Sequence, residues 1–324
     1  MPKIVKYSLL KYISNKFPLE EKINTLRIKD LNNKTIKKGC VIYLIERELR
    51  LNNNPALIFA IQKAQELNLD LKIVHPHVKY NNKAKQRFID NLIDEAGENF
   101  KKANLNFIIY QGNISDLNPA LLIIDFNPIL DRNYLKAADY KIYEIDGHNI
   151  IPARYISNKQ EYGAMTMRRK IYFNISEFLT EFKPISDIKT EAEYILDNFI
   201  KNKLPYYAEF KNDFSKNIHS GLSKYLNLGF ISSQKAAIEI IKSKNDDINK
   251  EIFLEELIIR KELADNFCLY CKNYKTFNCI PNWAKTSLKE HKQDIRPYIY
   301  NLKEYESAKT HDKLWNAIQT QLIK

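Results

Sequence analysis

Short apolar runs alternate with amphipathic stretches along the first half of the chain. Five runs rich in β-branched residues have the length of buried strands and lie at residues 41–45, 71–74, 107–110, 121–124 and 142–145. Helical periodicity follows the first run at 55–67 and the second at 83–103. Strands that are buried on both faces and separated by helices are typical of a parallel, doubly wound sheet. We therefore predict an α/β fold with a doubly wound parallel five-stranded sheet over residues 38–165.

Other segments near these strands have weaker patterns. Residues 1–37 are basic and predict an N-terminal arm with one short amphipathic helix near residues 7–17. Asn127-Pro128 favours the start of a helix between the last two strands, because proline fits the first turn of a helix. The turn at 46–54 contains no glycine, and this argues against a dinucleotide-binding fingerprint.

Helical periodicity continues through the second half of the chain. The candidate helices lie at residues 191–201, 232–242, 250–270, 281–290 and 312–323. This pattern predicts a helical linker over residues 166–200 and an all-α domain over residues 201–324.

Charge and hydropathy narrow the class of protein. Lys and Arg number 51 against 39 Asp and Glu, and the net charge of +12 favours a polyanionic partner such as DNA. The alternative is that many of the lysines only keep the protein soluble. No window approaches the roughly 18 consecutive apolar residues of a membrane span, and the first ten residues are too weakly apolar for a secretory signal. We expect a cytoplasmic, bacterial-type intracellular protein with no membrane contact.

The four cysteines do not form the framework of a disulfide-rich protein, and they indicate a reducing compartment. Cys268 and Cys271 have the spacing of a zinc ligand pair. Cys279 and His291 are too far apart to supply the usual second pair. We therefore expect no metal site.

Several polar segments could bind a ligand, and each also has a plainer explanation. Ser220-Gly-Leu-Ser223 could bind a phosphate or simply cap a helix. Glu256 and Arg260 lie four apart, which favours either an ion pair worth about 0.2–0.5 kcal/mol or the wall of a ligand pocket. The cluster Arg168-Arg169-Lys170 could contact DNA or form a solvated face, and His148 has no partner that the sequence identifies.

Five sequence blocks occur in order between residues 146 and 319: Asp146-Gly-His-Asn-Ile-Ile-Pro with Lys159-Gln-Glu-Tyr, Ser220-Gly-Leu-Ser with Gly229-Phe-Ile-Ser-Ser-Gln234, Glu255-Glu-Leu-Ile-Ile-Arg-Lys-Glu-Leu-Ala-Asp-Asn-Phe-Cys268, Pro281-Asn-Trp-Ala, and Ala308-Lys-Thr-His-Asp-Lys-Leu-Trp-Asn-Ala-Ile-Gln319. Together these blocks resemble class II cyclobutane-pyrimidine-dimer DNA photolyases, in the photolyase/cryptochrome family. A match of this many blocks is more specific than a single motif.

The resemblance implies an α/β antenna-type domain followed by a helical domain that holds FAD. In such enzymes the light-excited reduced flavin gives one electron to a flipped-out pyrimidine dimer, and the cyclobutane ring splits. The implied partner is double-stranded DNA carrying pyrimidine dimers. The antenna chromophore stays unknown, because no distinctive loop marks its site.

The resemblance also implies roles for single residues. Positions that match cofactor contacts are Tyr207, Ser220, Gly221, Leu222, Ser223 and Arg260. Glu256 matches the acid that hydrogen-bonds the dimer, with Glu255 as the less favoured choice. Trp315 and Asn316 match positions that line the cofactor and lesion cavity. Outside the resemblance, Arg168 and Arg169 are expected to contact DNA through their charge.

The sequence departs from the family pattern at two places. Lys224-Tyr-Leu-Asn-Leu-Gly229 stands where the family has Pro-Tyr-Leu-His-Phe-Gly, and Lys324 is reached where the family continues into a block that completes the flavin pocket. We therefore expect a C-terminally truncated photolyase whose chain alone holds FAD weakly or not at all. The alternatives are a non-catalytic remnant, one half of a split photolyase completed by a separately encoded C-terminal half, and a flavin-based light sensor without repair activity.

Overall fold

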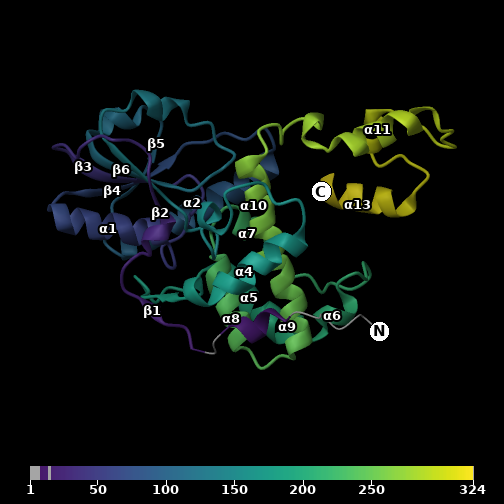
Figure 1. The fold of residues 1–324 in the computed structure, drawn as a ribbon, viewed down its shortest axis with the longest axis horizontal. Coiled ribbons are helices and arrows are strands. Elements are labelled where there is room, and N and C mark those ends of the chain that lie inside the picture. Colours follow the sequence, from purple (N-terminus) through teal and green to yellow (C-terminus); the bar gives the residue numbers. More distant parts are fainter. Residues whose placement is uncertain (1–7, 14–15, 324) are drawn as a thin grey trace. The chain divides into compact units, whose positions relative to one another are not determined.

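The computed structural model describes residues 8–13 and 16–323, and the first half of the chain forms a six-stranded sheet in the order β2-β7-β6-β3-β4-β5 (Figure 1). Its strands are β2 (Ile28–Asp30), β3 (Cys40–Leu44), β4 (Leu71–Pro76), β5 (Phe107–Tyr110), β6 (Pro119–Asp125) and β7 (Lys141–Ile145). The strands β3 to β7 are parallel, which confirms the predicted fold class and its five strands.

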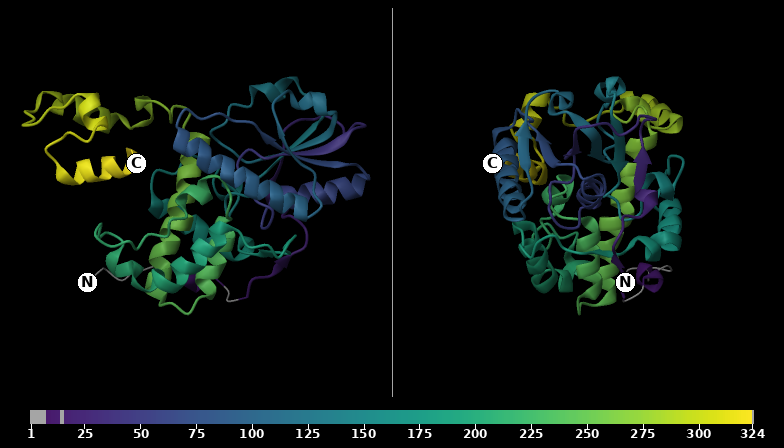
Figure 2. Two further views of the ribbon diagram at one scale, coloured as in Figure 1. Left: turned by 180° about the vertical axis from the view of Figure 1, so that it is seen from behind. Right: turned by 90° about the vertical axis from the view of Figure 1, so that its left-hand side faces the viewer.

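The sheet is buried on both faces, as its apolar strands require. Every residue of β3 and β6 is buried. The helices α1 (Pro55–Leu67) and α2 (Lys83–Lys102) follow the first two parallel strands and lie against the sheet (Figure 2). Their buried apolar side chains belong to the larger hydrophobic cluster. Other side chains of the strands form a second, smaller hydrophobic cluster. The 3₁₀ helices η3 (Ile114–Leu117) and η4 (Asn133–Ala137) pack against this cluster.

Residues within the expected N-terminal arm are part of the folded sheet. Strand β2 pairs antiparallel with β7 at the edge of the sheet. A second, two-stranded sheet joins β1 (Leu19–Glu20) to β8 (Glu181–Phe182). Only a 3₁₀ helix, η1 (Leu9–Tyr12), is present in the described part of the range expected to be an amphipathic helix, and residues 7, 14 and 15 lie outside the described residues. The arm therefore differs from its prediction, because short strand pairings leave no clear hydrophobic pattern.

The prediction of a helix that begins at Asn127-Pro128 is wrong. That segment contains only η4, and Arg132 precedes it with a non-helical backbone. The guanidinium of Arg132 pairs with the carboxylates of Glu46 and Glu144 at the end of the sheet. These buried contacts hold the chain away from helical geometry.

The second half of the chain is helical, as predicted. Its helices up to Tyr270 are α3 (Ala153–Ile156), α4 (Ala164–Phe178), α5 (Glu191–Asn202), α6 (Tyr207–Phe210), α7 (Ser223–Asn227), α8 (Ser233–Lys242), α9 (Asp247–Leu254) and α10 (Lys261–Tyr270). A π-helix (Glu255–Arg260) joins α9 to α10. Side chains of the sheet and of these helices share one hydrophobic cluster, which includes Leu57, Ile171 and Ile258.

Contacts divide the chain into one compact unit up to Lys272 and a second unit from Asn273. The second unit contains α11 (Asn282–Glu290), α12 (Leu302–Glu306) and α13 (Lys313–Ile323), and none of the residues described in these helices is buried. The predicted boundaries near residues 37, 165 and 200 stay predictions. Among the described helices, none is both long and apolar enough to cross a bilayer.

Candidate functional site

The helical segment from Asp247 to Tyr270 carries the central residues of the candidate site. The sequence predicted one α-helix over 250–270, but residues 255–260 form a π-helix between α9 and α10. A π-helix closes its hydrogen bonds between residues five apart, and such turns within α-helices are frequent at functional sites. The wider turn changes which side chains face one another.

Arg260 faces Glu255 and not Glu256, so the expected pair between residues four apart is wrong. The Nε atom of Arg260 lies 3.8 Å from Glu255 Oε1. Glu255 also accepts two hydrogen bonds from Arg168, at 3.1 Å from Nε and 2.6 Å from Nη2. Arg168 therefore joins α4 to the π-helix, whereas the neighbouring Arg169 is exposed. Of the two arginines expected to contact DNA, only Arg169 has an exposed side chain.

Glu256 lies in a corner formed by the π-helix and α6. Its side chain is 49% exposed, and its Oε1 lies 3.4 Å from Lys211 Nζ. Tyr207, the first residue of α6, packs edge-on against Phe199 and Phe253. Burial raises the pKa of Tyr207, and the charge of Glu256 raises it further. The half-exposed carboxylate of Glu256 can accept a hydrogen bond from an incoming polar group.

The Ser220–Ser223 segment is a tight turn on the surface. Gly221 has a φ of 74°, which favours glycine, and a side chain there would meet only Ile195 at 3.9 Å. Ser220 Oγ accepts a hydrogen bond from Leu222 N at 3.3 Å, and Leu222 is buried. Ser223 begins α7 and is exposed. The hydroxyl of Ser220 thus stabilises the turn itself, whereas the N-cap residue Leu222 makes no side-chain hydrogen bond that caps α7, and the turn leaves open space above Gly221.

Trp315 and Asn316 lie on α13 in the second unit. Trp315 packs edge-on against Tyr305 with ring centroids 5.3 Å apart. The amide of Asn316 accepts from Thr310 N at 3.0 Å and donates to Thr310 O at 2.7 Å. These contacts give Asn316 a role in closing the turn that precedes α13.

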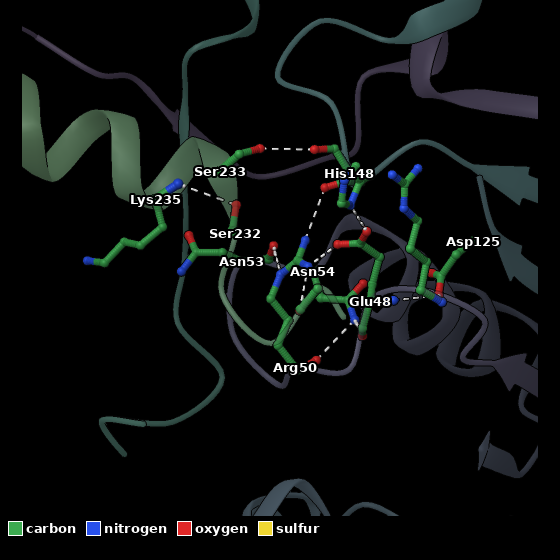
Figure 3. A network of polar contacts seen from close by, with 12 residues as sticks. Glu48, Arg50, Asn53, Asn54, Asp125, His148, Ser232, Ser233 and Lys235 are labelled. Atoms are coloured by element: carbon green, nitrogen blue, oxygen red, sulfur yellow. Dashed lines mark hydrogen bonds and ion pairs between the residues drawn. The ribbon is translucent and has the colours of Figure 1, made fainter. Parts of the chain in front are cut away.

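A network that the sequence did not predict lies at the carboxyl ends of the parallel strands (Figure 3). Asp125, the last residue of β6, accepts three backbone hydrogen bonds at Oδ2, from Glu46 N, Arg47 N and Glu48 N at 3.0, 2.9 and 2.9 Å. One buried carboxylate therefore shapes the loop after β3. A polar residue directly after a buried apolar run was the available signal for Asp125.

The same network gives His148 its partner. His148 Nδ1 lies 2.7 Å from Glu48 Oε1, and Glu48 also pairs with the guanidinium of Arg50 (Figure 3). Arg50 Nη1 donates to Gly229 O at 2.8 Å and Nη2 donates to Gly147 O at 3.0 Å. Burial lowers the pKa of His148 well below its usual value and lowers that of Arg50 to about 10. His148 is a satisfied buried histidine that joins two loops.

A cavity of about 90 Å³ lies beyond the carboxyl ends of β3 and β4. Its lining includes Arg47, His75, Tyr80 and Asn227. Ligands of α/β sheets bind at this edge, but pockets for drug-sized ligands have volumes of about 300–1,000 Å³. The cavity therefore identifies no antenna chromophore.

Cys40 is the first residue of β3, and the other three cysteines lie at or near the ends of helices. Cys268 and Cys271 are at the end of α10, whereas Cys279 belongs to a 3₁₀ turn of the second unit. Burial raises the pKa of Cys268. In the part of the chain that the structure describes, no three His, Cys, Asp or Glu side chains are grouped to hold a metal ion.

Comparisons with known proteins identify relatives that share one protein name. No family model matches the chain. Proteins named deoxyribodipyrimidine photo-lyase match it with 31% identity over 339 positions in Potorous tridactylus, 29% over 347 in Arabidopsis thaliana and 27% over 354 in Methanothermobacter thermautotrophicus. These matches cover 87%, 88% and 93% of this chain, and the chain spans 63%, 70% and 78% of the relatives.

A solved structure has the same fold. The crystal structure of a bacterial class III photolyase from Agrobacterium tumefaciens matches with a TM-score of 0.67 at 16% identity. The match covers 90% of this chain and 70% of the other. The α/β domain followed by helices is therefore the fold of a photolyase.

Proposed function

Since the relatives and the structural neighbour support the photolyase family for this chain, we propose that it acts in photolyase-type repair of pyrimidine dimers in DNA. The observation that carries the proposal is the similarity to deoxyribodipyrimidine photo-lyases along 87–93% of the chain. The ordered blocks between residues 146 and 319 favour the class II branch. The net charge of +12 suits a polyanionic partner.

FAD is the cofactor that we propose, and the residues of the first unit fit its phosphate side. Gly221 leaves open space above a tight turn, which allows the backbone to approach a phosphate closely. The side chain of Arg260 is 55% exposed, and its guanidinium has donors beyond the single contact with Glu255. Reduced FAD, when bound, would supply the electron that splits the dimer.

Glu256 is the residue that we propose to contact the dimer. Its carboxylate is half exposed, and its Oε1 lies 3.4 Å from the ammonium of Lys211. A charged acceptor at this place would hydrogen-bond the polar edge of an extruded base. Tyr207, at the start of α6, and Arg260, at the end of the π-helix, are the residues that we propose to orient the cofactor beside it.

The second unit favours an alternative in which residues 1–324 alone are inactive. Large apolar side chains of its helices are uncovered, and Trp283, Leu302 and Leu322 are 75%, 72% and 78% exposed. Exposed apolar faces of this extent mark surfaces that pack against further polypeptide. The chain also spans 63–78% of its relatives. We propose that further polypeptide, in the same chain or encoded separately, completes the flavin pocket.

Flavin titration of residues 1–324 tests this proposal. We expect weak FAD binding that is stronger than riboflavin binding, because only FAD has phosphates for the turn at 220–223. Arg260→Ala should weaken FAD binding by about tenfold or more, since hydrogen bonds to charged groups contribute about 1.5–3 kcal/mol. The same change should leave riboflavin binding unaltered.

Two results would contradict the proposal. Equal affinities for FAD and riboflavin would show that the phosphate side is not used. Stoichiometric FAD retention with light-dependent dimer splitting by residues 1–324 alone would show that no further polypeptide is needed.

A further inference from the structure

The π-helix determines which way two proposed ligand contacts point. Its six residues bring Arg260 beside Glu255 and leave Glu256 next to Lys211. A π-helix is rare in proteins, and a sparsely populated backbone conformation persists where its surroundings hold it. Its flanking helices should therefore be fixed from outside.

On the side of α10, the fixing contact comes from the α/β sheet. Arg47 donates two parallel hydrogen bonds to Asp265, Nη1 to Oδ2 at 3.1 Å and Nη2 to Oδ1 at 2.9 Å. Such a fork defines orientation as well as distance. The backbone of Arg47 is itself fixed by Asp125 at the end of β6. A rigid path therefore runs from the sheet to α10.

The block Asp146-Gly-His-Asn-Ile-Ile-Pro adds two contacts to the first turn of α10. Lys261 Nζ donates to His148 O at 2.7 Å. Glu262 Oε1 accepts from Ile150 N at 2.8 Å and from Ile151 N at 3.3 Å. The sequence analysis gave this block no structural role. In the structure, the block binds the first turn of α10, the helix directly after the π-helix.

On the side of α9, a carboxylate holds the helix to the N-terminal segment. Glu251 accepts hydrogen bonds from Leu9 N at 2.9 Å and Leu10 N at 2.7 Å, and it also contacts Ser8. Both helices that flank the π-turn are therefore tied to segments far away in the sequence.

We propose that Arg47 and Asp265 are positioning residues for the face that carries Glu256 and Arg260. Their two hydrogen bonds fix α10 against the sheet. This holds the π-helix in the conformation in which Arg260 contacts Glu255 and Glu256 contacts Lys211. The identity of the ligand that this face binds rests on the proposed function. The claim that the fork holds the π-helix does not depend on that function.

Hydrogen exchange tests whether the fork holds the π-turn. Arg47→Met removes the fork and keeps the aliphatic stem. Amides of residues 255–260 should exchange about tenfold faster in this variant, because local opening becomes easier. Arg132→Met is the matched control, since Arg132 is as buried (15% against 17% exposed) and pairs with carboxylates at the same sheet edge. Asp265→Asn should reproduce the effect if Arg47→Met does not fold.

Binding of dimer-containing DNA tests whether the fork acts on recognition. Arg47→Met should lower the ratio of affinities for dimer-containing and undamaged duplex by about tenfold, with the affinity for undamaged duplex unchanged. Asp265→Glu keeps the fork and should preserve the ratio within about twofold.

Acceleration at 255–260 that is no greater in Arg47→Met and Asp265→Asn than in Arg132→Met would overturn the inference. A ratio that stays unchanged while exchange rises would also overturn it. If the unaltered protein shows no preference for dimers, the proposed function fails, and exchange alone then decides whether the fork holds the π-turn.

Discussion

Gly229 marks the closest approach between the helical half of the chain and the loop after β3. A Cβ atom at this glycine would lie 2.1 Å from Arg47 O and 2.7 Å from Glu48 Cα. Its φ of 61° also favours glycine over other residues. The loop at 228–229 can therefore contact the sheet edge only with glycine at this position.

Gly229→Ala should lower the free energy of unfolding by at least about 2 kcal/mol, because both strain and a backbone clash oppose the new methyl group. Gly163→Ala is the control, since nothing lies within 4 Å of a Cβ atom there and its backbone is extended. That change should stay within about 0.5 kcal/mol in chemical denaturation. Equal effects of the two variants would contradict the close approach.

His75 gives a pH dependence at the residue scale. Burial lowers its pKa from 6.5 to about 4, and its Nδ1 has no partner in the described structure. The folded state therefore favours the neutral ring. The stability that this ring contributes is complete above pH 6.5 and falls as the pH decreases towards 4, by about 3 kcal/mol at most.

His75→Leu should remove that part of the loss of stability between pH 6.5 and 4. His77→Gln is the control, because His77 is exposed two residues away. Unfolding curves over this range measure both. An unchanged pH profile in His75→Leu would show that His75 is not buried as a neutral ring.

The pairing partners of single residues could not be predicted from the sequence. His148 meets Glu48 across 100 positions, and Arg47 meets Asp265 across 218. Neither residue type nor spacing indicates such a contact before the chain is folded. Asp125 was not predicted either, although a polar residue at the end of an apolar run was a usable signal for it.

At the scale of elements, continuous apolar runs were good predictors and short pairings were not. Every residue of β3 and β6 is buried, and burial on both faces leaves a continuous apolar run in the sequence. These runs allowed the two strands to be predicted. Strand β2 has only three residues, two of them exposed, and leaves no such pattern. The π-turn was hidden for another reason, because its apolar residues continue the helical stripe of α9 and α10.

Two neighbouring arginines on helix α4 have different surroundings and therefore different expected roles. Arg168 points to Glu255, whereas Arg169 is exposed. Arg169→Ala should weaken DNA binding and lower the slope of log affinity against log salt by about 0.9, the value for one phosphate contact. Its stability should change by less than about 0.5 kcal/mol.

Arg168→Ala should instead lower the free energy of unfolding by about 1 kcal/mol, because it leaves Glu255 without its fork. Salt titrations of DNA binding and denaturation of both variants measure the difference. A loss of DNA affinity in Arg168→Ala at unchanged stability, with none in Arg169→Ala, would reverse these roles.

At the scale of the whole molecule, the two units differ in how far they are stabilised by their own packing. The first has a hydrophobic cluster that runs from the sheet into the helices. The helices of the second contain no buried side chain among the residues described. The sequence predicted helices in both units, although not α12, but periodicity does not tell whether an apolar face is covered. Our proposals for the two units are that Glu256 in the first unit recognises the dimer and that further polypeptide completes the flavin pocket.

The most direct test of the proposed function is the equilibrium affinity for a duplex with one pyrimidine dimer, compared with the same duplex undamaged. We expect the dimer to be bound about tenfold more tightly by the unaltered protein, a difference of about 1.4 kcal/mol. Glu256→Gln should lower this preference, while Glu209→Gln, an exposed acid on α6, should not. Equal affinities for the two duplexes at every salt concentration would contradict a role in dimer repair.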